Sequence, residues 1–218
     1  MIRIGFDLAR IKEEYYCKLE LDDLTFILTE DDDEGRAELK MRFQTSENCE
    51  FIRLLGETDH SLLKYLNNTG CADGIIVESD LSDRSRCNIY IVELKRTVND
   101  QKWTGKVRKQ YRGATLRVLS FLSTLGITQV SKIEYITGYV YSSMDQHIDA
   151  VKSKRKVAQT SLIGKKTFLG IKDEEVLEWE QDEIRLFQGN FKHRKVQLVL
   201  NDQDVGTGAV SIENGTFK

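Results

Sequence analysis

Two apolar, β-branched runs joined by a short polar loop most constrain how this chain folds. The runs cover residues 74–77 and 89–94, and the loop between them contains aspartate, serine, arginine and asparagine without periodicity. This pattern predicts a β-hairpin. Neither run alternates cleanly between apolar and polar residues, which is typical of strands covered on both faces. We therefore expect the hairpin in the middle of a layered domain, for which 218 residues are sufficient.

Three charged residues lie at one end of this hairpin. Asp73 opens the first strand, and Glu93 and Lys95 close the second. In an antiparallel pair Asp73 falls opposite residue 95 or, with a small register shift, opposite residue 93, so the side chains lie within roughly 5–8 Å of one another. Glu93 and Lys95 share a face because strand side chains repeat every second residue. We expect these groups to converge at a sheet edge; the alternative is an ordinary surface salt bridge.

Such a cluster suits metal-assisted hydrolysis of a phosphodiester. Asp73 and Glu93, with the backbone carbonyl of Leu94, offer the hard oxygen ligands that Mg²⁺ and Mn²⁺ take. A bound ion lowers the pKa of a water ligand, and Lys95 would orient that water or the scissile phosphate. The pattern predicts Asp73, Glu93 and Lys95 as catalytic residues, and Asp73, Glu93 and Leu94 as metal ligands.

The arrangement resembles the PD-(D/E)xK nuclease superfamily, which has the restriction-endonuclease-like fold. Asp73 is followed after nineteen residues by Glu93-Leu94-Lys95 on an apolar strand, and the match covers roughly residues 51–143. Ala72 stands where the family has its proline. The resemblance implies an α/β (α+β) fold with a mixed central sheet flanked by helices. In the family the aspartate begins the second core strand, the E-x-K motif lies on the third, and a helix and a further strand follow.

The resemblance also implies a function. It predicts an endonuclease that uses Mg²⁺ or Mn²⁺ to cut nucleic acid in restriction, repair or phage defence, with DNA favoured over RNA as the substrate. Such enzymes often act as homodimers because cutting both strands needs two sites. The alternative is a non-catalytic module that keeps the fold to bind nucleic acid or protein.

Residues 47–66 occupy the place of the first core helix, since their apolar residues recur at helical spacing. In the resembled fold this helix often adds an acidic metal ligand. Glu50 and Glu57 are the acidic candidates, and His60 is a further one because some relatives use a histidine. The residues alone do not choose among them.

A second amphipathic helix is predicted over residues 102–125, ending at Gly126. Lys106 and Lys109 lie in its basic first half, and Gln110 matches the polar group that family nucleases carry on this helix. They are candidates for holding nucleic acid or the attacking water, against the alternative of a solvated helix edge. Alternating residues over 133–141 then predict a strand that completes the core.

The segments on either side of the core are predicted to be additions to it. Residues 1–46 are expected to form an N-terminal β meander packed on the core, residues 47–143 the nuclease core, and residues 144–218 a C-terminal α/β extension, separate or part of the same domain. A helix is expected over 145–159, and a hairpin over 183–188 and 195–201 that turns near Gly189-Asn190. The helix carries a basic run that either tracks phosphates or is solvated: Lys152, Lys154, Arg155 and Lys156.

Charge is unevenly distributed along the chain. Residues 1–100 carry 13 basic and 22 acidic side chains, a net charge of −9, whereas residues 101–200 carry 18 and 10, a net charge of +8. A basic segment after the proposed site suits a polyanionic substrate. Chance partition of charge between solvated faces is the alternative.

Other classes of protein find little support in the sequence. No apolar run approaches the length of a membrane span, so no membrane partner and a cytoplasmic location are expected. The four cysteines form no C-x-x-C pair, and G-x-S-x-G, H-E-x-x-H and P-loop motifs are missing. The acidic run near Gly35 does not fit an EF-hand loop, because Met41 stands where the loop needs glutamate.

Overall fold

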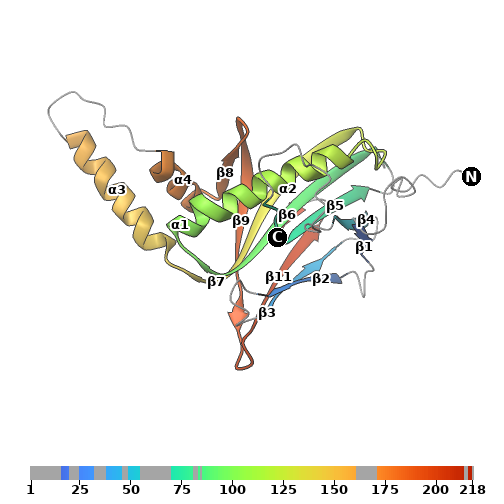
Figure 1. Cartoon of the computed structure of the whole chain (residues 1–218), viewed down its shortest axis with the longest axis horizontal. Helices are drawn as coiled ribbons and strands as arrows, with labels where there is room; N and C mark the ends of the chain where they lie inside the picture. The colour runs from blue at the N-terminus through green and yellow to red at the C-terminus, as the bar shows by residue number, and fades with distance from the viewer. Residues whose placement is uncertain are drawn as a thin grey trace, which may run out of the picture.

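A computed structural model shows a mixed α/β fold of two sheets and several helices (Figure 1). It describes residues 16–19, 25–31, 38–45, 49–54, 70–80, 83, 85–160, 171–213 and 216–217. These residues form a seven-stranded main sheet and a five-stranded second sheet. The described part of the chain contains no helix long and apolar enough to cross a membrane.

The main sheet is antiparallel on one side and mostly parallel on the other. Its strands, in spatial order, are β1 (Tyr16–Lys18), β4 (Cys49–Leu54), β5 (Gly74–Asp80), β6 (Arg86–Val98), β7 (Gln129–Ser142), β9 (Gly189–Gln197) and β8 (Glu183–Leu186). Strands β1, β4, β5 and β6 pair antiparallel, β7 and β9 continue parallel to β6, and β8 closes the sheet antiparallel to β9. The predicted hairpin is therefore β5–β6, at the centre of the sheet.

One long helical segment connects β6 to β7 and covers one face of the main sheet. It consists of α1 (Asp100–Lys102), a π-helical turn η3 (Trp103–Val107) and α2 (Arg108–Phe121). Asn99 caps its start by accepting a hydrogen bond from the Lys102 amide at 2.8 Å. Gly126, with φ of 77°, lies in the turn after its end. The predicted helix is confirmed, and its apolar stripe packs on the sheet.

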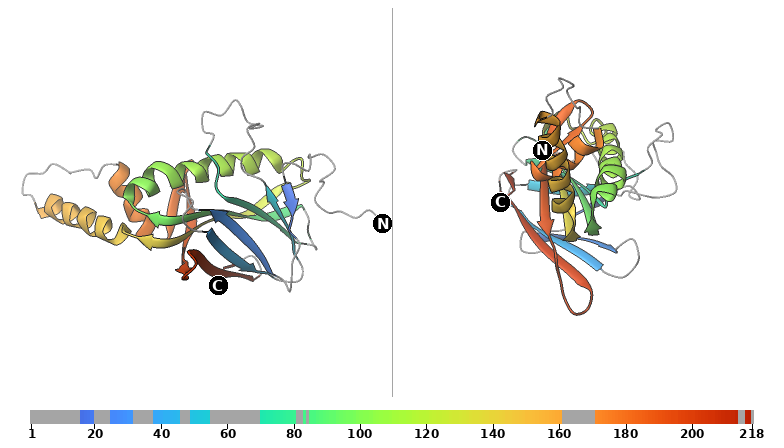
Figure 2. Two further views of the ribbon diagram at one scale, coloured as in Figure 1. Left: turned by 60° about the horizontal axis from the view of Figure 1, so that its bottom comes forward. Right: turned by 90° about the vertical axis from the view of Figure 1, so that its left-hand side faces the viewer.

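The second sheet covers the opposite face of the main sheet (Figure 2). Its strands are β2 (Thr25–Asp31), β3 (Glu38–Gln44), β11 (Val205–Glu213), β10 (Val199–Leu200) and β12 (Thr216–Phe217). β2 and β3 form an antiparallel pair, as the predicted N-terminal meander requires, and β11 pairs parallel to β3. Segments from near the two ends of the described chain therefore meet in one sheet.

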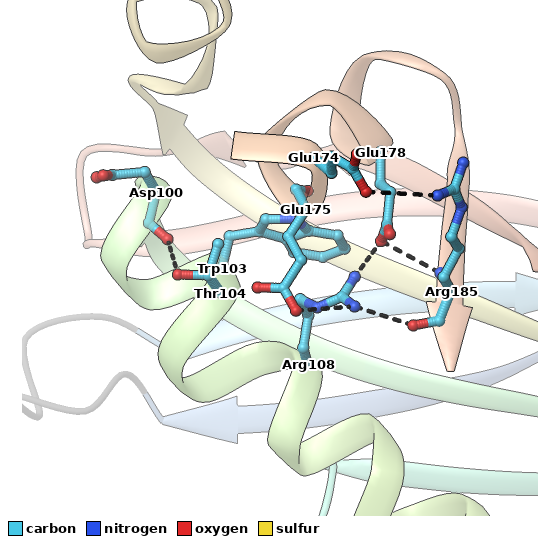
Figure 3. A network of polar contacts seen from close by, with 8 residues as sticks. All are labelled: Asp100, Trp103, Thr104, Arg108, Glu174, Glu175, Glu178 and Arg185. Carbon is cyan, nitrogen blue, oxygen red and sulfur yellow. Dashed lines mark hydrogen bonds and ion pairs between the residues drawn. The ribbon is translucent and has the colours of Figure 1, made fainter. Parts of the chain in front are cut away.

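The C-terminal helices pack against each other, and the second of them also contacts η3 and β8. They are α3 (Met144–Thr160) and α4 (Ile171–Glu180), and α4 has no counterpart in the sequence prediction. Arg108 of α2 is buried and fastens α4, because its guanidinium donates to Glu178 and lies 3.2 Å from Glu175 (Figure 3). Its Nη2 also donates to the Arg185 carbonyl of β8 at 2.9 Å.

Some of the predictions about the elements need correction. Residues 49–54 form strand β4 and not a helix, because Phe51 packs with the second sheet whereas Ile52 and Leu54 pack with α2. The rest of that predicted helix, with Glu57 and His60, lies outside the described residues.

The C-terminal segment, for which both alternatives were open, contributes β8 and β9 to the main sheet and β11 to the second. Its hairpin turns at Phe187 and Gln188, whose φ values are 56° and 107°, and not at Gly189-Asn190. Strand β1 likewise belongs to the main sheet and not to the β2–β3 meander.

Candidate metal site

Asp73 lies directly before β5, opposite Glu93. Gly74 pairs with Val92, so the same antiparallel register places Asp73 across from Glu93. Asp73 Oδ2 accepts a hydrogen bond from the Leu94 amide at 2.6 Å. Its own carbonyl accepts one from Arg53 Nη2, also at 2.6 Å. These bonds hold Asp73 against β6 at the point where the E-x-K motif begins.

Glu93 and Lys95 complete the cluster. Lys95 Nζ lies 2.5 Å from Glu93 Oε1 and 3.8 Å from Asp73 Oδ2. The side chains of Glu93, Lys95 and Asp73 are 0%, 6% and 10% exposed, so this is not a surface salt bridge. The structure brings together the three residues that the strand register predicted.

The carboxyl of Glu93 lies in an environment that disfavours its charge. Burial, followed by the negative charge of Asp73, raises the pKa of Glu93 to about 8, although Lys95 and the Asp73 backbone N–H oppose the shift. Both oxygens of Glu93 are buried, and the donors that face the carboxylate are the Lys95 ammonium and the Asp73 backbone N–H. A buried carboxylate whose ionisation is disfavoured fits a hard cation, which supplies positive charge without a proton.

The backbone carbonyl of Leu94 is the third predicted ligand. It accepts a hydrogen bond from Lys95 Nζ at 3.0 Å. A carbonyl oxygen has a second lone pair, so it can accept this bond and still face a cation. The described residues contain no group of three Asp, Glu, His or Cys side chains placed to hold a metal ion. A cation here would depend on Asp73, Glu93, the Leu94 carbonyl and water.

Helix α2 places polar groups above the cluster. Gln110 Nε2 donates to the Cys71 carbonyl at 3.3 Å, next to the segment that carries Asp73. Tyr111 is fully buried, and its hydroxyl lies 2.7 Å from Thr137 Oγ1. Burial, together with Glu93 and Asp73, raises the pKa of Tyr111 well above its ordinary value, although the Thr137 hydrogen bond opposes this. Tyr111 is therefore a neutral hydroxyl beside the two carboxylates.

The hydrogen-bonded chain continues from Tyr111 into the sheet. Thr137 faces Glu93 across β6–β7, and its Oγ1 lies 2.8 Å from His193 Nε2. Burial and the charges of Lys195 and Arg108 lower the pKa of His193 to about 3, so the ring is neutral. The sequence did not reveal this row of hydrogen bonds, because Tyr111 belongs to the apolar stripe of its helix. Thr137 and His193 lie on strands far from it in the sequence.

Two acidic residues of the N-terminal half differ in their distance from the cluster. Glu50 lies on β4 opposite Ser79 and pairs with Lys18 at 2.9 Å, so it is at the far end of β5 from Asp73. Glu30 of β2 is near the cluster. Burial and the charge of Asp73 raise the pKa of Glu30, and Lys95 and Arg53 oppose the shift. Its sequence signal was obscured, because it begins an acidic run that resembles a solvated turn.

The predicted nucleic-acid contacts fall into two groups. Lys106 and Lys109 are exposed on the same helical segment as Gln110. Lys152 donates to Glu180, and Lys154 lies 3.6 Å from Asp173, so both contact α4. Figure 1 shows α3 extending beyond the end of the main sheet, away from β5. The side chains of Arg155 and Lys156 lie outside the described residues.

A groove of about 680 Å³ lies between β9 and β11. The basic side chains that line it come from β9, namely Lys192, Arg194 and Lys195. Asp182 lies 2.8 Å from Lys195, and buried Glu134 lies 3.5 Å from Arg194. The basic cluster of β9 is thus largely balanced by nearby carboxylates.

The chain matches no protein-family model, no curated protein and no solved structure.

Proposed function

We propose that this protein is a metal-dependent endonuclease that hydrolyses phosphodiester bonds of nucleic acid. The observation that carries the proposal is the buried Glu93 carboxylate, which lies with Asp73 and Lys95 where the start of β5 meets the middle of β6. Lys95 offsets only part of the cost of burying two adjacent carboxylates, since the pKa of Glu93 is still raised to about 8. A cation-binding role gives a reason for the arrangement.

The order of elements around the cluster supports the resemblance to PD-(D/E)xK nucleases. Asp73 directly precedes β5, the second strand of the antiparallel series β4–β5–β6, and Glu93 and Lys95 lie on the third strand. Helix α2 and the parallel strand β7 follow. This is the sequence of elements that the resemblance predicts. The first core helix is the part of the resembled fold that the described residues do not supply.

The residues have distinct roles in the proposed reaction. Asp73, Glu93 and the Leu94 carbonyl would hold Mg²⁺ or Mn²⁺, which supplies an activated water ligand and neutralises phosphate charge. Lys95 orients the water or the scissile phosphate from its position between the carboxylates. The neutral hydroxyl of Tyr111 and the Gln110 amide supply hydrogen-bonding groups on the side of the site that α2 covers. Lys106 and Lys109 contact the phosphate backbone beside it.

The substrate is proposed from the resemblance. It favours DNA over RNA, a homodimer for double-strand cleavage, and a cytoplasmic role in restriction, repair or phage defence. Mg²⁺ and Mn²⁺ remain equivalent choices, since both take oxygen ligands.

The experiment combines substrates, cations and near-isosteric variants. Purified protein is incubated with plasmid, single-stranded DNA and RNA in Mg²⁺, Mn²⁺ or EDTA, alongside Asp73→Asn and Glu93→Gln. Cleavage by the wild type with either cation, and its loss in EDTA and in both variants, supports the proposal. Absence of cation-dependent cleavage on every substrate overturns it.

A second candidate is a non-catalytic nucleic-acid- or protein-binding module. The observation that favours it is the enclosure of Lys95, whose ammonium contacts Glu93, Asp73 and the Leu94 carbonyl. An ammonium held this way can stabilise the pairing of β5 with β6 without a substrate. Nucleic-acid binding without cleavage in the same experiment selects this candidate.

A further inference from the structure

We propose that Glu30, on the second sheet, is a positioning residue for a hydrated divalent cation held by Asp73 and Glu93. The inference rests on the proposed function and deepens it, because it makes the N-terminal β-hairpin part of the metal site. In this role Glu30 does not touch the ion and holds one of its water ligands.

The alternation of β2 directs Glu30 toward the main sheet. Phe26 and Leu28 are buried, Ile27, Thr29 and Asp31 are exposed, and Glu30 is partly buried. Side chains two residues apart share a face of a strand, so Glu30 continues the inward row of Phe26 and Leu28.

The contact of Leu28 fixes where that row meets the main sheet. Leu28 Cδ2 lies only 2.7 Å from the position that a Cβ atom on Gly74 would occupy. Gly74 directly follows Asp73, and Glu30 lies one side-chain repeat beyond Leu28, about 7 Å along the strand. The charges that act on Glu30 are those of Asp73, Lys95 and Arg53, with the adjacent Asp31. Together with the Leu28–Gly74 contact, these charges indicate that the Glu30 carboxylate lies on the Asp73 side of Leu28.

The net charge of the cluster explains how Glu30 would strengthen cation binding. Asp73 and Glu93 are faced by two cations, Lys95 and Arg53. With both carboxylates ionised this group has no net charge and attracts a divalent cation poorly. A third carboxylate makes the group negative, which favours the cation.

A water-mediated role agrees with the placement of the acidic side chains. Within the described ranges no three acidic, histidine or cysteine side chains are close enough to ligate one ion together. Mg²⁺ usually keeps several waters and uses one or two carboxylates directly. The Glu93 carboxylate, which is fully buried beside Asp73 and Lys95, marks the inner ligand position. Glu30 is then left to accept a hydrogen bond from a water on the exposed side of the ion.

The test measures cation binding directly. Mn²⁺ is titrated calorimetrically into the wild type, Glu30→Gln, Glu30→Asp and Asp31→Asn, without nucleic acid. Asp31→Asn is the matched control, because it removes the same charge from the same strand on the exposed face. Loss of a partner that holds a metal ligand typically weakens affinity by about 10–100-fold. We expect Glu30→Gln to weaken Mn²⁺ binding by about tenfold or more, Glu30→Asp to restore part of it, and Asp31→Asn to change it by less than about threefold.

The outcomes separate this inference from the proposed function. Thermal unfolding in EDTA should be the same for Glu30→Gln and the wild type, which shows that the fold is intact. If the wild type binds Mn²⁺ and Glu30→Gln binds it equally well, the inference is overturned and the proposed function stands. If Asp31→Asn weakens binding as much as Glu30→Gln, a general field effect replaces the positioning role. If the wild type binds no divalent cation, both proposals are overturned.

Discussion

At the scale of single residues, the protonation of Glu93 controls the site. Its pKa rises from 4.5 to about 8 in the folded protein, so between these pH values the folded state holds a proton that the unfolded state has lost. Stability contributed by this group is therefore fully present below about pH 4.5 and is lost as pH rises through about 8. A divalent cation at Glu93 would replace the proton and oppose the loss.

This predicts how stability depends on pH and on cation. In EDTA the free energy of unfolding should fall between pH 5 and 8.5, by an amount on the order of a few kcal/mol from this group. Saturating Mg²⁺ or Mn²⁺ should reduce the fall. Urea unfolding at several pH values measures it, and Glu93→Gln is the control because it cannot ionise. An equally steep fall in Glu93→Gln would assign the pH dependence to other groups.

A second prediction separates catalysis from binding. Asp73→Ala and Glu93→Ala remove negative charge near a polyanion, so both should abolish cleavage while nucleic-acid affinity stays similar or tightens. Lys95→Ala removes a positive charge, so it should lose cleavage and bind somewhat more weakly. Cleavage assays and binding measurements in EDTA report the two effects. Equal losses of affinity in all three variants would indicate a structural salt bridge.

At the scale of elements, Arg108 joins α2 to α4 and β8. Burial raises the pKa of Glu178, whereas the Arg108 guanidinium and the Arg185 amide oppose the rise, so removal of Arg108 leaves an uncompensated buried carboxyl (Figure 3). Arg108→Met should destabilise the protein by roughly 3–5 kcal/mol. The pair Arg108→Met/Glu178→Leu should recover much of this loss. Urea unfolding tests both, and no recovery in the double variant would contradict the assignment.

The exposed side of the helical segment carries the prediction for nucleic acid. Replacing Lys106 and Lys109 together by Ala should weaken binding to every sequence alike. The slope of log K against log salt should decrease by about 0.9 for each duplex phosphate that a lysine no longer neutralises. Lys152→Ala/Lys154→Ala is the comparison, because these lysines contact α4 carboxylates. An unchanged slope for Lys106 and Lys109 would return them to a solvated helix edge.

At the scale of the whole molecule, glycine lets the two sheets approach each other closely. A Cβ on Gly138 of β7 would lie 2.6 Å from Leu94 Cδ2 and from Met41 Cε, so it would meet side chains of both sheets. Gly138→Val should destabilise the protein by roughly 1–3 kcal/mol through overpacking. Gly105→Ala is the control, since nothing lies within 4 Å of an added Cβ there, and it should be neutral or slightly stabilising. Chemical unfolding measures both variants. A free energy of unfolding that Gly138→Val leaves unchanged would refute close packing at this point.

The sequence by itself determined the features that depend on local pattern. The β5–β6 hairpin followed from two apolar runs, and its register brought Asp73, Glu93 and Lys95 together. The helix before β7 followed from the period of its apolar residues. These predictions succeeded because strand and helix periods are set by neighbouring residues. Where a segment is apolar on both faces, as in β4, periodicity does not distinguish helix from strand, and residues 49–54 were predicted wrongly.

Only the tertiary structure decided which distant residues meet. The parallel pairing of β11 with β3 and the extension of the main sheet by β9 join segments far apart in the chain. The layering of the two sheets packs Leu28 of β2 against Gly74, next to Asp73, and the row of hydrogen bonds through Tyr111, Thr137 and His193 crosses three elements. No local pattern encodes these contacts, because they depend on how the faces of the two sheets and of the helix pack against each other.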